Sequence, residues 1–236
     1  GHIPGAVNCS LRALDQPEAN RKGLPVPLEQ ARALFRDLGI SQRTRVVAYD
    51  DQGGRFAARF FYVAEFFGHR RVRVLNGGWP AWLQAGGSQE TETRPMPPGN
   101  FEPRPNPRCI ATAEWIQARL AGNKLQLLDV RSAEEYSGTS APAGGRGGHI
   151  PGAIHLDWRQ TTTESGRGRF KAPQELRRLL LERGVDLRRE TVTYCASGIR
   201  SAQLYFVLRL LGQGKVRNYD GSWADWGSRA DLPVQR

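Results

Sequence analysis

The chain has 236 residues, enough for one large domain or two small ones, and its 39% hydrophobic and 24% charged residues are typical of a globular protein. No stretch approaches the roughly 18 consecutive apolar residues of a membrane span, so we expect no membrane association. The net charge of +11 comes from arginines scattered through both halves, which disfavours a nucleic-acid-binding face but favours a small anionic substrate.

The first half of the chain begins with the motif GHIPGAV at residues 1–7. Apolar runs at 45–49 and 72–75 then predict two strands. Residues 56–67 between them are apolar nearly all round, which predicts a helix packed deep against a sheet. Residues 89–108 are rich in proline, and they predict a semi-rigid, extended linker.

In the second half, apolar runs at 125–130, 191–194 and 216–219 predict strands. A helix is expected to begin at Pro173 and stop at Gly184, and residues 201–211 predict a second, deeply buried helix. Strands that alternate with helices indicate a parallel sheet covered by helices on both faces.

The two halves are copies of one unit. The opening motif returns as GHIPGAI at 148–154, and further matches follow at a spacing that shortens one residue at a time. The later matched pairs are Gly53 with Gly198, Arg55 with Arg200, Trp79 with Trp223, and Trp82 with Trp226. Two copies of so long a unit indicate a duplicated domain, because solenoid arrays repeat about every 20 to 50 residues and need three or more copies.

We therefore expect an α/β protein of two tandem domains, residues 1–88 and 109–236, joined by the linker 89–108. The second copy has residues 109–147, including a strand, before its GHIPGA motif, whereas the first copy has nothing there. The first domain is thus expected to be truncated at its N-terminus and to expose an apolar face or sheet edge. The chain starts at Gly1 and its only methionine is Met96, so the sequence does not show the native start.

The three cysteines, Cys9, Cys109 and Cys195, are widely spaced, with no CxxC motif and no histidine pair at metal-ligand spacing. We expect no disulfide framework, no metal site and no cofactor. This pattern fits a reducing compartment and predicts a cytoplasmic location. Cys9 aligns with Leu156 and is interpreted as a filler residue of a strand.

Cys195 has the context of a reactive thiol. It follows an apolar strand and precedes a short loop of Ala196, Ser197, Gly198 and Ile199, after which a long helix begins. The free N–H groups and the dipole of a helix N-terminus favour an anion, so we expect the thiolate to be a ready nucleophile. Arg200 adds a forked donor for an anionic substrate.

The same loop in the first copy carries Asp50 in place of the cysteine. A carboxylate cannot perform thiol chemistry and repels anions. We therefore expect the first domain to be catalytically silent and the second to be active.

The whole chain resembles the tandem-domain rhodanese family, which contains the thiosulfate sulfurtransferases and the 3-mercaptopyruvate sulfurtransferases. The resemblance rests on the paired GHIPGA motifs, the strand end 129–131, the CxxGxR loop and the segment DGSWxxW at 220–226. It implies that Cys195 takes the outer sulfur of thiosulfate as a persulfide and passes it to cyanide or a thiol acceptor. It also implies that residues 196–199 cradle the persulfide and that Arg200, with Arg146, binds the substrate.

Two departures from the family pattern bear on the sulfur donor. Some thiosulfate enzymes have arginine at the position of Pro151 and a basic residue at that of Ala196. The loop also resembles that of mercaptopyruvate enzymes, which commonly have threonine or serine where Arg200 stands. Because arginine suits a compact dianion, thiosulfate is the expected donor and mercaptopyruvate the alternative.

Two further functions stay open. A cysteine phosphatase also holds a thiolate above a helix, but its loop runs C-x5-R, whereas this one is C-x4-R with Ser201 in the place of the arginine. A sulfur-carrier module without turnover is the other alternative, since a persulfide on Cys195 can be delivered to a partner protein.

Other candidates have plain structural interpretations. His2 and His149 occur in both copies of the motif, so hydrogen bonding within the fold is expected of them. The four repeated tryptophans are expected to pack the core, with Trp223 also a candidate wall of the substrate site. Asp129 is expected to act either as a charge partner near the site or as a helix cap.

Overall fold

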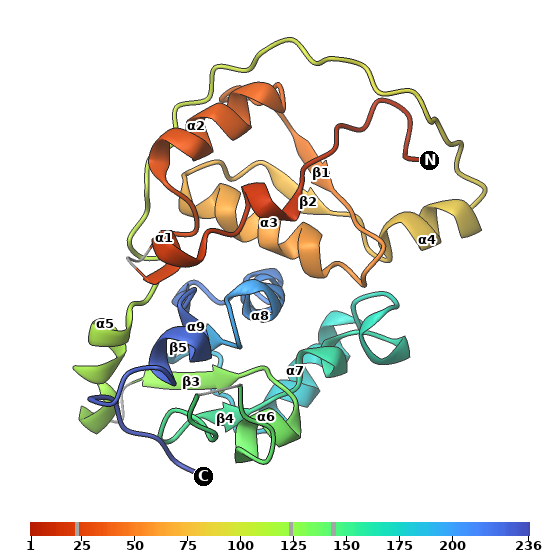
Figure 1. The fold of residues 1–236 in the computed structure, drawn as a ribbon. Helices are drawn as coiled ribbons and strands as arrows, with labels where there is room; N and C mark the ends of the chain where they lie inside the picture. The colour runs from red at the N-terminus through yellow and green to blue at the C-terminus, as the bar shows by residue number, and fades with distance from the viewer. Residues whose placement is uncertain (22–23, 123–124, 143–144) are drawn as a thin grey trace.

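The computed structural model describes residues 1–21, 24–122, 125–142 and 145–236. They form two α/β units, one above the other in Figure 1, and each unit is built on a parallel sheet. The predicted tandem α/β architecture is therefore confirmed. In these described stretches, no helix has the length and apolar character needed to cross a membrane.

The first unit holds a two-stranded sheet in its described part. Strand β1 (Val46–Ala48) pairs in parallel with β2 (Val72–Val74), and the crossover between them is α3 (Arg55–Phe66). Strand β1 leaves Val47 58% exposed. The other elements of this unit are a 3₁₀ turn at Leu11–Ala13, α1 (Pro17–Arg21), α2 (Leu28–Asp37) and α4 (Gly78–Gln84).

The second unit holds a four-stranded parallel sheet in the order β4-β3-β5-β6. Its strands are β3 (Leu125–Asp129), β4 (Ile154–His155), β5 (Glu190–Tyr194) and β6 (Val216–Asn218). Its helices are α5 (Ala113–Gln117), α6 (Ala133–Ser137), α7 (Pro173–Glu182), α8 (Ile199–Leu210) and α9 (Ser222–Trp226), with 3₁₀ turns at Leu120–Gly122, Trp158–Thr161 and Glu164–Gly166.

Strand β3 shows why helices cover both faces of this sheet. Successive side chains of a strand point to opposite faces. Leu128 joins an apolar cluster with residues of α7 and α8, whereas its neighbour Leu127 joins a second cluster with residues of α5 and α9. Both leucines are at most 3% exposed, so each face of the sheet is buried under helices.

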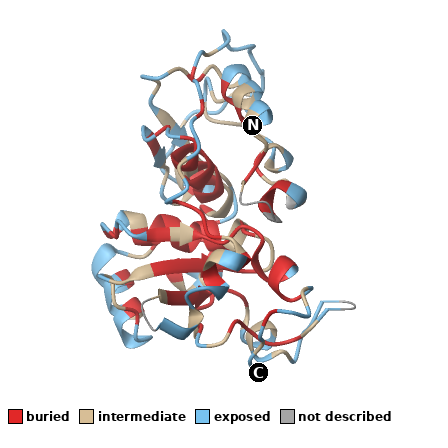
Figure 2. Ribbon diagram, turned by 90° about the vertical axis from the view of Figure 1, so that its left-hand side faces the viewer, coloured by how far each residue is buried: buried red, intermediate tan, exposed pale blue. Residues whose placement is uncertain are grey.

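The two units share one apolar core, which passes through the contact between α3 and α8. Tyr62 meets Tyr205 and Phe61 meets Phe206, with ring centroids 5.0 Å apart in each edge-to-face pair. Figure 2 shows the buried residues of α3 continuing into those of the sheet and helices below. Burial of aromatic surface of this kind makes separation of the units costly.

Buried charges also cross this interface. Arg59 of α3 is fully buried, and its Nη1 donates to Asp220 Oδ1 at 2.6 Å and to the Gly198 carbonyl at 3.4 Å. Glu65 of the same helix accepts from the Tyr205 hydroxyl at 2.8 Å and pairs with Arg209 at 2.5 Å. The first unit therefore contacts the loop that leads into α8.

The proline-rich segment is bound along the first unit. It has no helix or β-strand from 91 to 106, and in Figure 1 it runs as a long extended loop around that unit. Its backbone nevertheless donates from Gly99 to the Arg36 carbonyl and from Arg104 to the Phe67 carbonyl, both at 2.8 Å, and Phe101 is 3% exposed. The exact domain boundaries, at 88 and 109, stay predictions.

Replacing Glu65 by Gln tests the charged part of the interface. The change removes the counter-charge of Arg209 but keeps an acceptor for Tyr205, so we expect the free energy of unfolding to fall by about 2 kcal/mol. Urea unfolding measures this loss. The matched control is Glu182→Gln, because the ion pair of Glu182 with Arg178 is exposed and 3.8 Å long, and its loss should cost less than about 0.5 kcal/mol. Equal losses in the two variants would contradict the prediction.

Candidate functional site

Cys195 lies at the carboxyl end of β5, directly before the loop that leads into α8. Its side chain is 1% exposed, and its Sγ accepts a hydrogen bond from the backbone N–H of Gly198 at 3.2 Å. Gly198 has φ +88°, and a Cβ on it would lie 2.8 Å from Asp220, so glycine is required there. The loop thus aims a backbone donor at the sulfur.

Helix α9 holds the other side of this loop. The N–H groups of Trp223 and Ala224 donate to the carbonyls of Cys195 and Ala196 at 3.0 and 2.9 Å. Ser222 Oγ accepts from the Cys195 N–H at 3.1 Å and lies 4.0 Å from Sγ. Because α9 bonds the carbonyls of the loop, these carbonyls point away from the sulfur, and the N–H of Gly198 faces it.

Ser222 is a site residue that sequence reasoning did not identify, although it belongs to the DGSW segment. Its φ of 49° is rare for a residue with a Cβ and costs about 1–3 kcal/mol. The matching residue of the first unit is Gly78, where a Cβ would lie 1.9 Å from the Asp50 carbonyl oxygen. The strained serine therefore stands only in the unit that carries the thiol.

In the first unit, the Asp50 carboxylate fills the loop that corresponds to the Cys195 loop. It accepts four backbone hydrogen bonds of 2.7 to 2.9 Å, from Gln52, Gly54, Phe56 and Ala57. A carboxylate held by N–H groups at a helix N-terminus shows that this loop suits an anion. In the second unit, the start of α8 faces a thiol instead.

The two loops differ in length by one residue, and this overturns the expected pairing of Arg55 with Arg200. Helix α3 begins after Gly54 (φ 83°) and α8 begins after Gly198 (φ 88°), so Gly54, and not Gly53, takes the place of Gly198. Arg55 consequently matches Ile199. A G-x-R pattern occurs in both loops by sequence, but the arginines stand at different positions of their helices.

Arg200 is close to Cys195 but already has a partner. Its two terminal nitrogens bond the carboxylate of Glu135 on α6 at 2.7 and 2.8 Å. Burial alone would raise the pKa of Glu135, but the bonds from Arg200 and from the Ser132 N–H lower this pKa to about 2. Sequence reasoning missed Glu135; its only signal was the S-x-x-E capping box that starts α6.

The structure places Arg146 against the C-terminal segment. Its guanidinium donates to four backbone carbonyls, those of Trp226, Gly227, Arg229 and Leu232. Its own carbonyl accepts from the Trp223 indole at 2.9 Å. Arg146 therefore links the segment before GHIPGA to the chain around α9.

Asp129 acts on the GHIPGA motif through Arg131. The two side chains form a buried ion pair at 2.5 Å, and Arg131 also donates to the Gly148 carbonyl at 2.7 Å. The Arg131 guanidinium lies 4.4 Å from the Trp223 ring centroid. His149 Nδ1 lies 3.0 Å from the Tyr136 carbonyl oxygen, the kind of structural hydrogen bond expected of it, and its ring stacks on Tyr136 with centroids 3.7 Å apart.

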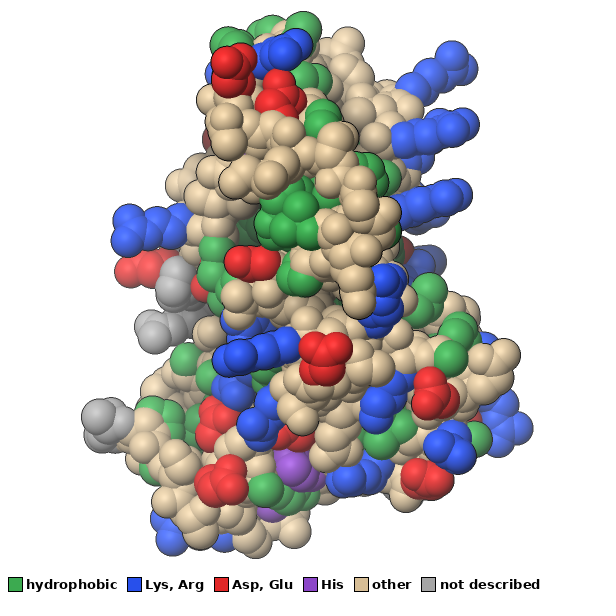
Figure 3. All heavy atoms as spheres, turned by 90° about the vertical axis from the view of Figure 1, so that its right-hand side faces the viewer, with side chains coloured by type: hydrophobic (Ala, Val, Ile, Leu, Met, Phe, Trp, Pro, Cys, Tyr) green, Lys and Arg blue, Asp and Glu red, His purple; other side chains and the backbone are tan. Residues whose placement is uncertain are grey.

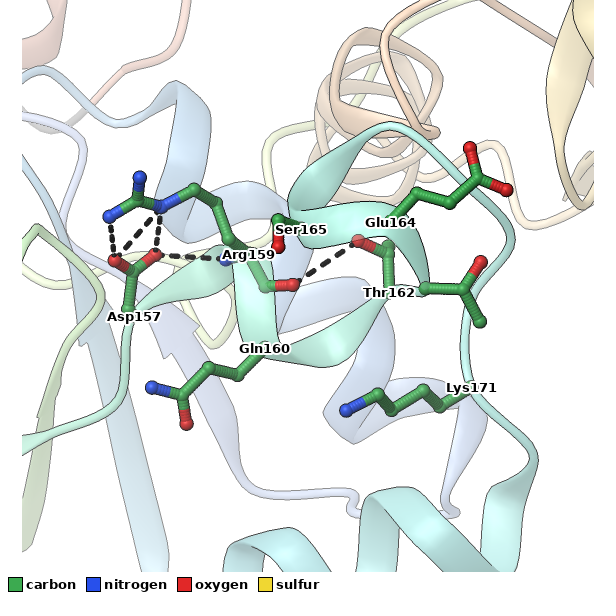
Figure 4. Close-up of a pocket in the computed structure, with 8 residues that line it drawn as sticks. Asp157, Arg159, Gln160, Thr162, Glu164, Ser165 and Lys171 are labelled. Atoms are coloured by element: carbon green, nitrogen blue, oxygen red, sulfur yellow. Dashed lines mark hydrogen bonds and ion pairs between the residues drawn. The ribbon is translucent and has the colours of Figure 1, made fainter.

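Two pockets lie near this region, and Cys195 lines neither. Figure 4 shows a polar pocket of about 480 Å³ in which Arg159 pairs with Asp157 and Lys171 contributes a second cation. The other, of about 460 Å³, is lined by Arg146 and Trp223 among others. Considering only the residues that the structure describes, no cluster of three His, Cys, Asp or Glu side chains is placed to hold a metal ion.

Charge on the surface is mixed. On the face drawn in Figure 3, acidic and basic side chains alternate over the second unit without a field of one sign. Over the first unit, by contrast, a row of Lys and Arg side chains projects along the right-hand edge of the figure.

Curated relatives match the chain along its whole length. It is 35% identical over 238 residues to a thiosulfate sulfurtransferase of Pseudomonas aeruginosa, covering 100% of this chain and 86% of that protein. It is also 35% identical over 248 residues to the sulfur carrier protein TtuD of Thermus thermophilus, with the same coverage of 100% and 86%.

Solved structures share the fold. A variant of EanB in complex with ergothioneine superposes with a TM-score of 0.87 at 25% identity, over all of this chain but only 60% of that one. SseA of Escherichia coli, described as a 3-mercaptopyruvate sulfotransferase, superposes with a TM-score of 0.81 at 29% identity, over 94% of this chain and 83% of that one. The model of the rhodanese-like domain matches residues 1–85 and 112–229. With a match in each unit and full-length relatives, this chain belongs to the rhodanese family.

Proposed function

We propose that the chain is a sulfurtransferase that carries sulfur as a persulfide on Cys195. The observation that supports this most is the pair of loops: one binds its own carboxylate at Asp50, and the other presents a thiol to the start of a helix. A relative named thiosulfate sulfurtransferase covers the full chain, which supports thiosulfate as the sulfur donor.

The reaction has two half-steps. The Cys195 thiolate attacks the outer sulfur of thiosulfate, a bond forms between Sγ and that sulfur, and the S–S bond of thiosulfate breaks as sulfite leaves with the electron pair. Cyanide or a thiolate acceptor then attacks the terminal sulfur of the persulfide. The bond between Sγ and the terminal sulfur breaks, Sγ takes the electron pair and returns to the thiolate, and the acceptor leaves with the sulfur, as thiocyanate when it is cyanide.

The loop 196–199 and the first turn of α8 hold the persulfide anion. The first N–H groups of a helix have no partner within it. In α3 the corresponding groups bind Asp50, so in α8 the N–H groups of Gly198, Arg200 and Ser201 correspond to those that bind the carboxylate. Preorganised donors of this kind stabilise charge as it develops on the sulfur.

Arg200 holds the sulfonate end of the donor, and Glu135 fixes the plane of its guanidinium. Because both terminal nitrogens of Arg200 already bond Glu135, the donor meets an oriented ion pair and not a free cation. Arg146, whose donors are taken by backbone carbonyls, supports the wall next to Trp223 in this proposal.

A sulfur-carrier function is the second candidate, because TtuD matches the full chain at 35% identity. It shares the persulfide but delivers the sulfur to a partner protein. We place either function in a reducing compartment such as the cytoplasm, since all three cysteines are free. Persulfide formation without turnover with cyanide would favour the carrier over the enzyme.

Intact mass after incubation with thiosulfate tests the persulfide. We expect a gain of one sulfur atom, about 32 Da, in the native protein and none in Cys195→Ser. The other thiols serve as internal controls, because burial raises the pKa of Cys9 to about 11 and also raises that of Cys109. A gain of the same mass in Cys195→Ser would refute the assignment.

Turnover of two sulfur donors tests the substrate. At equal concentration and with cyanide as acceptor, we expect kcat/KM for thiosulfate to exceed that for 3-mercaptopyruvate, because an arginine at 200 suits a compact dianion. Thiocyanate formation measures both rates. A much higher kcat/KM for mercaptopyruvate would contradict the prediction and make mercaptopyruvate the sulfur donor.

Replacing Glu135 by Gln tests the ion pair of Arg200. The pKa of Glu135 is lowered in the folded protein, so its charge stabilises the fold above about pH 4.5, and this contribution is lost as the pH falls toward about 2. We expect Glu135→Gln to lose about 1 kcal/mol at pH 7 and the difference from wild type to shrink at pH 3.5. Urea unfolding at the two pH values gives both numbers. A difference that stays constant with pH would speak against the pair.

A further inference from the structure

Most arginines near the reactive thiol have their donors occupied. Arg200 pairs with Glu135, Arg131 with Asp129, and Arg159 with Asp157. Arg146 is bound by four carbonyls. These arginines therefore already have a carboxylate or backbone carbonyls as partners when a dianionic sulfur compound approaches Cys195.

Arg55 of the first unit is different. Among the described residues, it makes no hydrogen bond or ion pair within bonding distance, and its Nε is buried without any acceptor. A buried donor of this kind costs free energy unless a ligand supplies the acceptor. Unlike Arg200, Arg55 has free N–H groups to offer an anion.

Aromatic rings from both units fix the position of Arg55. Its guanidinium carbon lies 4.6 Å from the ring centroid of Phe56 in its own helix and 5.1 Å from that of Trp158, which follows β4 in the second unit. Stacking on two rings orients a planar cation and leaves its edges free for hydrogen bonds. Arg55 is thus held at the junction of the units without a counter-ion.

Helix α3 brings Arg55 toward the Cys195 loop, because Arg59, one turn further along this helix, donates to the Gly198 carbonyl at 3.4 Å. Burial lowers its pKa, the charge of Asp50 opposes this, and Arg200 and Cys195 are also near enough to act on it. The Asp50 carboxylate does not bond it, because four backbone N–H groups already hold that carboxylate. Among the described residues, no carboxylate is therefore bonded to this half-buried cation.

We propose that Arg55, supplied by the catalytically silent unit, binds the oxyanion end of the sulfur donor and of the sulfite product. The inference rests on the proposed sulfur transfer and adds a second cationic contact to Arg200. It gives the first unit a direct part in substrate binding across the domain interface. The anion supplies the acceptor that Nε lacks in the free protein.

Calorimetric titration with sodium sulfite tests this contact without turnover. The protein is first treated with cyanide to remove bound sulfur, so that sulfite cannot react. We expect Arg55→Gln to weaken sulfite binding about tenfold, the loss of one charge-assisted hydrogen bond. Arg55→Lys keeps the charge and should recover part of the affinity. The matched control is Arg43→Gln, an exposed arginine before β1, at the opposite end of that strand from Asp50, which should leave the affinity unchanged.

Steady-state kinetics separates binding from a general loss of structure. In Arg55→Gln, the KM for thiosulfate should rise about tenfold while kcat at saturating thiosulfate changes less than about twofold. Removal of sulfur by cyanide from protein already loaded with persulfide should keep its wild-type rate. A merely structural role would lower kcat and slow this second half-step as well.

The results also separate this inference from the proposed function. Sulfite that binds wild type and Arg55→Gln equally, or that binds neither, overturns the role of Arg55 even if Cys195 takes up sulfur. Sulfite binding that depends on Arg55 supports the contact even if no sulfur appears on Cys195, and in that case only the proposed sulfur transfer fails.

Discussion

The first turn of a helix placed over the end of a parallel strand leaves backbone N–H groups that need an acceptor, and both units of this protein are arranged around that need. In the first unit, the Asp50 carboxylate accepts hydrogen bonds from these N–H groups. In the second, the Gly198 N–H reaches only a sulfur atom. The same backbone geometry thus holds a carboxylate in one unit and faces a thiol in the other, where we propose that it binds the persulfide anion.

The contact between the units bears directly on this loop. Arg59 is fully buried and bonds the carbonyl of Gly198, the residue whose N–H faces the sulfur. Its ion pair with Asp220 supports the same end of the loop, since Asp220 lies against Gly198. Together with the aromatic contacts of α3 with α8, these bonds tie the position of the Cys195 loop to the first unit.

Much of this fold could be predicted from local pattern. Buried runs such as 125–129 and 190–194 are strands because their side chains fill both faces, and Pro173 marks a helix start that the structure confirms. The cysteine and its turn followed from the order of strand, glycine and helix. These features depend on neighbours in sequence, which a sequence pattern records.

The contacts that complete the site depend on tertiary structure. Glu135 reaches Arg200 from a different helix. Ser222 bonds the Cys195 N–H from a backbone with positive φ, which serine rarely adopts and which the sequence does not reveal. Arg146 was expected to bind substrate because of its place before GHIPGA, yet its N–H groups donate to carbonyls at the end of α9 and in the chain after it. The pairing of Arg55 with Arg200 was wrong because a one-residue difference in loop length cannot be located from matching letters alone.

The loop between Asp50 and α3 is one residue longer than the loop between Cys195 and α8. Exchanging Asp50 for cysteine would not by itself recreate the other turn, because the backbone between it and α3 is longer and the occupants of the loop differ in size. Gly78 also lacks the hydroxyl that Ser222 supplies to the cysteine peptide. To reproduce the Cys195 loop in the first unit would therefore take a one-residue deletion together with Asp50→Cys and Gly78→Ser.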